Sequence, residues 1–359
     1  MTPTVTTGTI TVTDLTKVFV NFKRREGVGG ALRDLFQREY QKMTAVDHIS
    51  FDIGRGELVG YIGANGAGKS TTIKMLTGIL VPSSGTVRIN GLEPYNNNLH
   101  KKLIGVVFGQ RTQLWWDIAV IEAFHLLQKI YEVPQAEYEA RLKRFGDLLE
   151  LDELLHKPVR KLSLGQRMRC DLGASLIHNP PVVFLDEPTI GLDISVKSRI
   201  RQFIKDINRE HGTTVILTTH DLVDIEEVCS RLLIIDRGKL LYDGLLSALK
   251  DRFGRTRRLT IDFIDHVTPE QLAPQLDGWG EGAVEWSCPV EGQCEISFDR
   301  TRVTATDLIN ALLPAFPARD FALREPEIGD IVKSIYEQGA EYKVMRAEAG
   351  FDKEPASVA

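Results

Sequence analysis

A glycine-rich segment beginning at Gly63 is the part of the sequence whose chemistry can be inferred most directly. It reads Gly63-Ala64-Asn65-Gly66-Ala67-Gly68-Lys69-Ser70 and matches the pattern G-x-x-x-x-G-K-[ST]. Glycines let the backbone curl so that successive N–H groups point at phosphate oxygens, and a following helix N-terminus adds its dipole. We expect Lys69 to reach the β- and γ-phosphates of a nucleotide, Ser70 to ligate Mg²⁺, and Thr71 to join the nucleotide contacts.

Two adjacent carboxylates, Asp186 and Glu187, follow the apolar run 182–185. A run of this kind is typical of a strand inside a parallel sheet. At its end, Asp186 suits a direct or second-shell contact with Mg²⁺. Glu187, one residue further, is placed to polarise an attacking water as general base.

The elements that must position these residues alternate between strand and helix. Residues 58–62 predict a buried strand, and a helix is expected from near Ser70 to Gly78. Further buried strands are expected at 214–217 and 232–235, and one helical stripe at 196–207. The pattern predicts an α/β fold with a parallel sheet.

The segment Leu162-Ser163-Leu164-Gly165-Gln166 resembles the signature of the ABC ATPases, usually L-S-G-G-Q, with Leu164 in place of a glycine. By itself the segment is a serine that caps a helix. Downstream of a phosphate loop and ahead of Asp186-Glu187, it indicates the family. The resemblance implies that Ser163 to Gln166 bind the γ-phosphate held by a second subunit.

Other positions are carried over from the same resemblance. Gln110 looks like the glutamine that senses Mg²⁺ and the attacking water, with Gly109 as an extra residue and Gln113 as a competing candidate. His220 resembles the switch histidine, and Asp193 belongs to a loop that crosses the dimer interface. Phe19 stands where the family places an aromatic that stacks on adenine, although an apolar strand-end residue is the simpler alternative.

The resemblance also implies an assembly. It covers residues 8–248 and is most similar to the ATP-binding subunits of bacterial type-2 ABC exporters. These subunits sandwich two ATP molecules in a head-to-tail homodimer with Mg²⁺ and serve separate transmembrane permease subunits. The implied location is the cytoplasm, peripheral on the inner face of the plasma membrane. Trp115 and Trp116 could form the groove for a permease helix or could be core residues. The resemblance places the transport pathway in the permease subunits, so drugs, lipid-linked glycans and peptides are all open as substrates.

We expect an ABC ATPase domain at 8–248, with a mixed sheet, an antiparallel β subdomain and a helical subdomain at 111–178. A basic insert at 20–44 carries helical spacing over Leu32, Leu35, Phe36 and Tyr40, which favours a helix on the domain edge or one at a membrane surface. A small accessory α+β domain is expected at 255–345, and the tail 346–359 is expected to be disordered.

The composition argues against a nucleic-acid-binding protein and against a membrane-spanning protein. The 359 residues carry a formal net charge of −5, so there is no global basic field and no nucleic acid is expected as partner. No apolar run approaches a membrane span of ~20 residues, and the N-terminus does not resemble a signal peptide. A soluble ABC ATPase acting on nucleic acid or ribosomes is the alternative function. A phosphate-loop kinase or GTPase is disfavoured by residues 162–166 and by His220.

The cysteines are too few for a disulfide framework: there are four in the chain. Cys288 and Cys294 flank a turn-like segment and could face each other in a hairpin. Two reduced thiols are the favoured interpretation, and a redox pair or half of a metal site is the alternative.

Overall fold

The computed structural model describes residues 9–22, 40–95, 97–109, 111–254, 256–280, 282–290, 292–325, 328–337 and 345–346. Gln110, residues 23–39 of the basic insert and residues 347–359 of the expected tail lie outside these ranges. The described chain divides into two compact units. The first comprises the described residues up to Gly244 together with Met345 and Arg346. The second begins at Leu245, and its last described residue is Glu337.

The first unit is organised on a sheet of seven strands in the order β14-β9-β8-β3-β7-β6-β5. Within this order, β8, β3, β7, β6 and β5 pair in parallel with one another, and most of their residues are buried. Their side chains are apolar on both faces, as expected of a sheet covered on both sides. The strands are β3 (Leu58–Gly63), β5 (Ile104–Phe108), β6 (Val182–Asp186), β7 (Thr214–Thr218), β8 (Arg231–Asp236), β9 (Lys239–Leu245) and β14 (Met345–Arg346).

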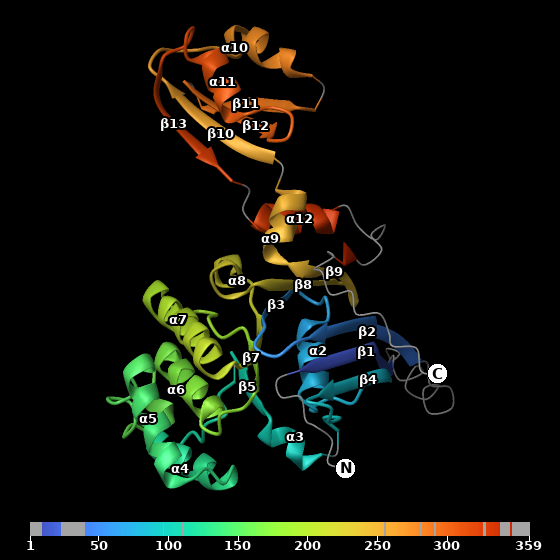
Figure 1. Ribbon diagram of the computed structural model, residues 1–359, viewed down its shortest axis with the longest axis vertical. Helices are drawn as coiled ribbons and strands as arrows, with labels where there is room; N and C mark the ends of the chain where they lie inside the picture. Colours follow the sequence, from blue (N-terminus) through green and yellow to red (C-terminus); the bar gives the residue numbers. More distant parts are fainter. Residues whose placement is uncertain are drawn as a thin grey trace, which may run out of the picture. The chain divides into compact units, whose positions relative to one another are not determined.

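Helices follow most of these strands and cover the sheet. In Figure 1, α2 lies on one side of the parallel strands, and α5, α6 and α7 lie on the other. The helices are α2 (Lys69–Leu76), α3 (Asn98–Lys102), α4 (Val120–Ile130), α5 (Gln135–Leu149), η1 (Val159–Lys161), α6 (Leu164–Leu176), α7 (Ile194–His211) and α8 (Leu222–Val228). None of the helices in the described part of the chain is long and apolar enough to cross a membrane.

A three-stranded antiparallel sheet, in the order β2-β1-β4, completes the first unit. Its strands are β1 (Ile10–Phe22), β2 (Tyr40–Ile53) and β4 (Ser84–Ile89). β1 and β2 extend into the basic insert, where Phe22 pairs with Tyr40. The helical interpretation was therefore wrong at residues 40–42, which lie in β2. In this part of the insert, pairing with β1 along a long β-ribbon determines the conformation, although the apolar residues recur at helical spacing.

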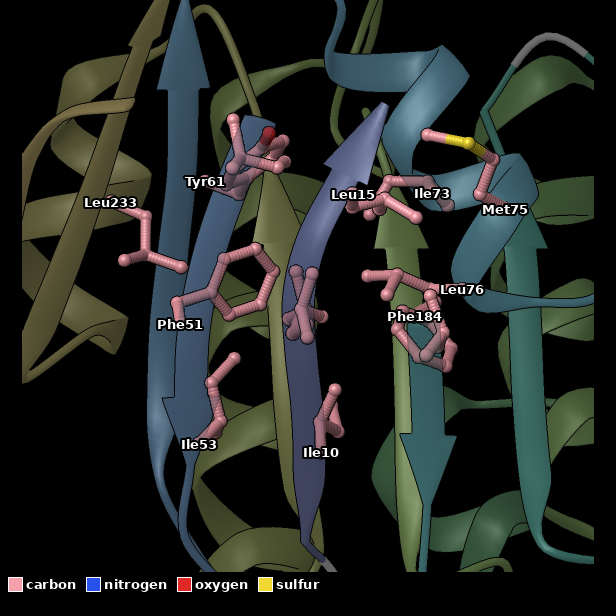
Figure 2. Packing of buried hydrophobic residues seen from close by; sticks show 14 of the residues in the cluster. Ile10, Leu15, Phe51, Ile53, Tyr61, Ile73, Met75, Leu76, Phe184 and Leu233 are labelled. Atoms are coloured by element: carbon pink, nitrogen blue, oxygen red, sulfur yellow. The ribbon is translucent and has the colours of Figure 1, made fainter. Parts of the chain in front are cut away.

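The main core lies between the antiparallel sheet, α2 and the parallel strands. Figure 2 shows Phe51 of β2 beside Tyr61 of β3, whose ring centroids are 6.3 Å apart. Ile73 and Leu76 of α2 and Phe184 of β6 lie in the same cluster, each at most 1% exposed. This core fixes α2 against the strands that carry the acidic residues.

The second unit contains a four-stranded antiparallel sheet with α10 (Pro269–Leu276) and α11 (Ala305–Leu312) packed on one face (Figure 1). The buried side chains Leu259, Ile261 and Ile296 point from the sheet toward Leu272 and Leu308 of the helices. The strands, in the order β11-β12-β10-β13, are β10 (Thr256–Phe263), β11 (Val284–Val290), β12 (Gln293–Asp299) and β13 (Ala318–Arg324). The helices are α9 (Leu246–Phe253), α10 (Pro269–Leu276), η2 (Asp277–Trp279), α11 (Ala305–Leu312) and α12 (Ile328–Glu337).

Cys288 and Cys294 are both free thiols. Cys294 is fully buried in the core of the second unit, and burial first, then the neighbouring Cys288, raises its pKa to about 12. A thiol with so high a pKa is protonated at neutral pH.

Candidate nucleotide site

The phosphate loop connects the end of β3 to the first turn of α2. Gly68 caps α2 with a φ of 110°, a conformation that L side chains rarely adopt, and a Cβ there would lie 2.4 Å from the backbone oxygen of Ala45. Gly66 also has a positive φ, of 80°. The glycines therefore set the path of the loop, and Ser70 and Thr71 follow in the first turn of α2.

Lys69 lies across the mouth of the loop. Its Nζ donates to the backbone oxygens of Gly63, at 2.6 Å, and Ala64, at 3.2 Å. The residue is 6% exposed, and burial lowers the pKa of the ammonium despite the opposing influence of Glu187 and Asp186. A partly desolvated ammonium at the start of the helix that follows the loop is suited to bind phosphate oxygens.

Asp186 and Glu187 lie at the end of β6, where Thr218 of the adjacent strand β7 holds both. The hydroxyl of Thr218 donates to Oδ1 of Asp186 at 2.5 Å, and the amide of Glu187 donates to the backbone oxygen of Thr218 at 2.9 Å. Glu187 has a φ of +57°, so the chain turns sharply directly after the strand. A non-glycine residue in this conformation is uncommon and often marks a functional site.

His220, two residues after Thr218, contacts the carboxylate of Glu187. Its Nε2 lies 2.7 Å from Oε1 of Glu187. The imidazole is about half exposed, whereas the Glu187 side chain is 19% exposed. The structure thus brings together the expected general base and the expected switch histidine.

Gly109 forms a contact that the sequence did not predict. Its N–H donates to the backbone oxygen of Asp186 at 2.7 Å, and a Cβ at this position would lie 2.1 Å from the backbone oxygen of Glu187. Phe108 pairs with Asp186 in the sheet, so the chain leaving β5 passes directly against the acidic pair. Only a glycine permits this approach, and no local pattern signalled it.

Gln113, the competing candidate for the sensing glutamine, is engaged elsewhere. Its side-chain amide donates to the backbone oxygen of Asp171 at 2.8 Å, and its N–H donates to Oδ1 of Asp171 at 3.1 Å. The hydroxyl of Thr112 donates to the same Oδ1 at 2.8 Å. These bonds hold the segment after β5 against the middle of α6.

Asp171 is a buried carboxylate that the sequence analysis did not single out. It is 3% exposed, and burial raises its pKa to about 6 although three hydrogen bonds and Arg167 act in the opposite direction. A cavity of about 190 Å³ lies beside it, lined also by Phe108 and Arg111. The signal available in the sequence was one acidic residue directly before the mostly apolar run 172–177.

The signature segment begins α6. The amide of Gln166 donates to the Ser163 hydroxyl at 3.3 Å, and the amide of Ser163 donates to Oε1 of Gln166 at 3.0 Å, which together form a capping box. Leu164, the first helical residue, has ordinary helical geometry, so the glycine usual there is not needed for conformation. Among the described residues, no hydrogen bond joins 163–166 to the phosphate loop of the same chain.

The signature packs on the loop that carries Asp193. A Cβ on Gly191 would lie 3.2 Å from Cδ2 of Leu164, and one on Gly165 would lie 3.7 Å from Leu192. Asp193 caps α7 by accepting from the amide of Val196 at 2.9 Å. The signature and the Asp193 loop thus form one contiguous surface.

Phe19 and the tryptophan pair lie apart from these contacts. Phe19 is half-buried on β1, with Nζ of Lys17 5.4 Å from the centroid of its ring. Trp115 and Trp116 are 42% and 50% exposed, and the guanidinium of Arg167 lies 5.7 Å from the ring centroid of Trp116. Of the two interpretations of these tryptophans, the alternative that they are core residues is wrong, because both present a large aromatic surface to solvent.

The fold and the site together define a phosphate-loop ATPase, and comparison with known proteins identifies its family. Residues 46–190 match the family model described as ABC transporter. The chain is 31% identical to the ABC transporter ATP-binding protein NatA of Bacillus subtilis, over 60% of this chain and 87% of that protein. This chain belongs to the family of ABC transporter ATP-binding subunits and is an ATPase.

Relatives of known transport direction are also similar. A methionine import ATP-binding protein, MetN of Latilactobacillus sakei, is 34% identical over 68% of this chain and 72% of its own length. A Nod factor export ATP-binding protein of Ralstonia nicotianae is 34% identical over 58% of this chain and 64% of its own length.

Solved structures confirm the fold. An ATP-binding subunit of an ABC transporter matches with a TM-score of 0.57 and 25% identity, over 68% of this chain and 93% of that one. The ATP-binding cassette MJ0796, in a dimeric post-hydrolysis state with ADP and Pi, matches with a TM-score of 0.55 and 24% identity, over 66% of this chain and 98% of that one. The expected ABC ATPase fold, with its mixed sheet and antiparallel β subdomain, is confirmed.

Proposed function

We propose that this subunit hydrolyses ATP within a head-to-tail homodimer and that dimer closure drives export through separate permease subunits. The observation that carries the proposal is the contact of Glu187 with His220 at the end of β6, 2.7 Å between Oε1 and Nε2. This pair is held beside Asp186 and Lys69 by the sheet and by the phosphate loop.

In the proposed reaction, Lys69 and the N–H groups of the phosphate loop bind the β- and γ-phosphates. Glu187 accepts a proton from the water that attacks the γ-phosphate, and a carboxylate within hydrogen-bond reach of that water accelerates the step. His220 orients the carboxylate and donates toward the developing charge. Thr218 keeps Asp186 and Glu187 in register throughout.

Mg²⁺ fits the oxygens available at this site. The hydroxyl of Ser70 and the carboxylate of Asp186 are hard oxygen ligands of the type that Mg²⁺ prefers, and Gln110 is a further proposed ligand. Bound Mg²⁺ would neutralise charge on the phosphate oxygens. Phe19 is proposed to contact the adenine.

The second face of each ATP is proposed to come from Ser163 to Gln166 of the other subunit. The contiguous surface made by the signature and the Asp193 loop supports this, since Ile194 beside it is 82% exposed. A two-fold axis would use this surface twice and complete two sites. The dimeric cassette MJ0796 has the same fold.

The permease contact is proposed at the helical subdomain, residues 111–178, through the exposed rings of Trp115 and Trp116. Both import and export subunits are similar to this chain, and we assign export from the resemblance of residues 8–248 to type-2 exporters. Such a subunit would act in the cytoplasm on the inner face of the plasma membrane. The proposed domains remain 8–248 for the ATPase and 255–345 for the accessory domain.

Substitution of Glu187 by Gln tests the proposal. The amide cannot accept the proton of water, whereas the phosphate loop is unchanged. We expect ATP hydrolysis to fall roughly 10²–10⁴-fold and an ATP-bound dimer to accumulate, visible by size-exclusion chromatography with light scattering. Glu153→Gln, an exposed position on the same unit, serves as the control. Wild-type turnover by Glu187→Gln would exclude Glu187 as the base.

A further inference from the structure

Strand β13 forms one edge of the sheet in the second unit. Within the described residues, β10 is the only strand paired with it. Phe321 and Leu323 lie on the same face as the buried Leu259 and Ile261, yet they are 50% and 44% exposed. Exposed edges with apolar side chains are sites where a further strand adds.

The opposite face of β13 carries charges in an unfavourable register. Arg324 pairs with Arg258, and Asp320 pairs with Asp262, so like charges stand directly opposite one another on adjacent strands. Cross-strand pairs of like charge destabilise a sheet. Among the described residues, neither Asp320 nor Arg324 takes part in an ion pair that would offset this.

The sequence of β13 is self-complementary about Ala322. If a second copy of the strand runs antiparallel with Ala322 opposite Ala322, Asp320 faces Arg324 of that copy and Phe321 faces its Leu323. The charged row across the joined sheets then reads Asp262, Asp320, Arg324, Arg258. Two negative positions are therefore followed by two positive positions, and each like-charged pair gains an opposite neighbour.

The register also suits the backbone. In an antiparallel edge strand, alternate residues direct their N–H and C=O groups outward. Pairing Ala322 with itself places Asp320 opposite Arg324 and Phe321 opposite Leu323, so outward-facing residues always meet outward-facing residues. Hydrogen bonds therefore form between the two copies of β13 whichever of the two alternating sets of residues directs its N–H and C=O groups away from β10.

We propose that β13 is a self-association surface, and that it pairs antiparallel with β13 of a second copy of this chain about a two-fold axis at Ala322. The two four-stranded sheets then form one continuous sheet, with Phe321 and Leu323 covering each other across the seam. This association needs no nucleotide and is separate from the proposed ATP-dependent contact of the cassettes.

Charge reversal in the full-length, nucleotide-free chain tests the proposal by sedimentation velocity in EDTA. Wild type is expected to show a concentration-dependent dimer that weakens in high salt. Asp320→Arg and Arg324→Asp should each weaken the dimer at least about tenfold, since each places like charges across the seam. Both variants relieve a like-charge pair with β10, so they are expected to fold, which circular dichroism verifies.

Two combinations should restore association. The double variant Asp320→Arg/Arg324→Asp again pairs opposite charges across the axis. A one-to-one mixture of the two single variants should give a heterodimer, because the arginine introduced at position 320 of one chain then meets the aspartate introduced at position 324 of the other. The native Arg324 of the first chain likewise meets the native Asp320 of the second. Restoration in both cases would exclude a general effect of charge.

A cysteine cross-link tests the register itself. Directly opposed residues lie within disulfide range, so Ala322→Cys should give a covalent dimer on mild oxidation. Arg319→Cys lies three residues from the axis, which places the two sulfurs roughly 20 Å apart, and it should not cross-link. The proposal would be overturned if the wild-type protein sedimented as a monomer at about 100 µM. It would also be overturned if Ala322→Cys and Arg319→Cys cross-linked equally.

Discussion

The imidazole Nε2 of His220 lies 2.7 Å from Oε1 of Glu187. These residues come from different strand ends: Glu187 directly follows β6, and His220 follows β7. The pairing of Asp186 with Thr218 sets the distance between them, because it fixes the register of the two strands. The contact thus follows from the parallel sheet, and it joins the proposed base to a group that can orient it.

Replacing His220 by Ala should lower hydrolysis about 10²-fold or more while ATP binding is retained. The carboxylate of Glu187 loses its orienting partner, but the phosphate loop is unaffected. Steady-state phosphate release and nucleotide titration measure the two effects separately. His211→Ala, at the exposed end of α7, is the control. Full activity of His220→Ala would show that the contact has no part in hydrolysis.

Lys69→Ala should weaken nucleotide binding itself. Charge-assisted hydrogen bonds to phosphate contribute about 1.5–3 kcal/mol, which corresponds to a dissociation constant raised about 10- to 150-fold. Titration with a fluorescent ATP analogue measures the change. Lys74→Ala lies on the exposed face of the same helix and should bind as wild type does. Equal affinities for the two variants would contradict the assignment of the phosphate loop.

Gly109→Ala should impair hydrolysis from a position that touches no nucleotide in the proposed mechanism. The added Cβ would lie 2.1 Å from the backbone oxygen of Glu187, so the acidic pair must move. We expect activity to fall at least about tenfold and stability to fall by about 1–3 kcal/mol. Gly278→Ala has open space around its Cβ and is the control. Unchanged activity would mean that the chain after β5 can move away from Glu187 to accommodate the added Cβ without disturbing the acidic pair.

Asp171→Asn should change the pH dependence of stability. The ordinary pKa of the carboxyl is 3.8, and the folded protein raises it to about 6. Between these values the folded state binds more protons than the unfolded state, so this group lowers stability as pH rises through 6, and the loss is complete about one pH unit above 6. The variant lacks this titration but keeps an acceptor for Thr112.

The stability of Asp171→Asn relative to wild type should therefore increase by about 1–2 kcal/mol between pH 5 and pH 7.5. Urea unfolding followed by tryptophan fluorescence at each pH measures this difference. Asp147→Asn, an exposed position on α5, should follow wild type throughout. A difference that shrinks with rising pH would contradict the raised pKa of Asp171.

The residues predicted from sequence were those whose signals are local. The phosphate loop needs only its glycines and Lys69, and the run before Asp186 shows a buried strand ending at an acidic pair. The strand-helix order then brings their ends together, because parallel strands share one carboxyl edge. The α/β fold followed from the same pattern.

Contacts that depend on register between distant segments were not predicted. Gly109 meets Glu187 because Phe108 pairs with Asp186, and Gln113 meets Asp171 across 58 positions of sequence. The helical spacing after Leu32 continued into residues that pair as strand, since Tyr40 lies opposite Phe22. Such pairings depend on the partner strand, which periodicity within one segment does not reveal.

The shared ATP site is tested most directly by mixing two inactive variants, Lys69→Ala and Ser163→Arg. Each homodimer has two broken sites if every site takes its phosphate loop from one chain and its signature from the other. A mixed dimer has one site with both lesions and one with neither. Ser198→Arg, exposed on α7, controls for the added charge.

We predict that each variant alone hydrolyses almost no ATP and that the equimolar mixture regains about a quarter of the wild-type rate. Half of randomly assorted dimers are mixed, and each mixed dimer has one intact site of two. Hydrolysis at the wild-type rate by Ser163→Arg alone would contradict the head-to-tail site, because residues 163–166 would then serve only to cap α6.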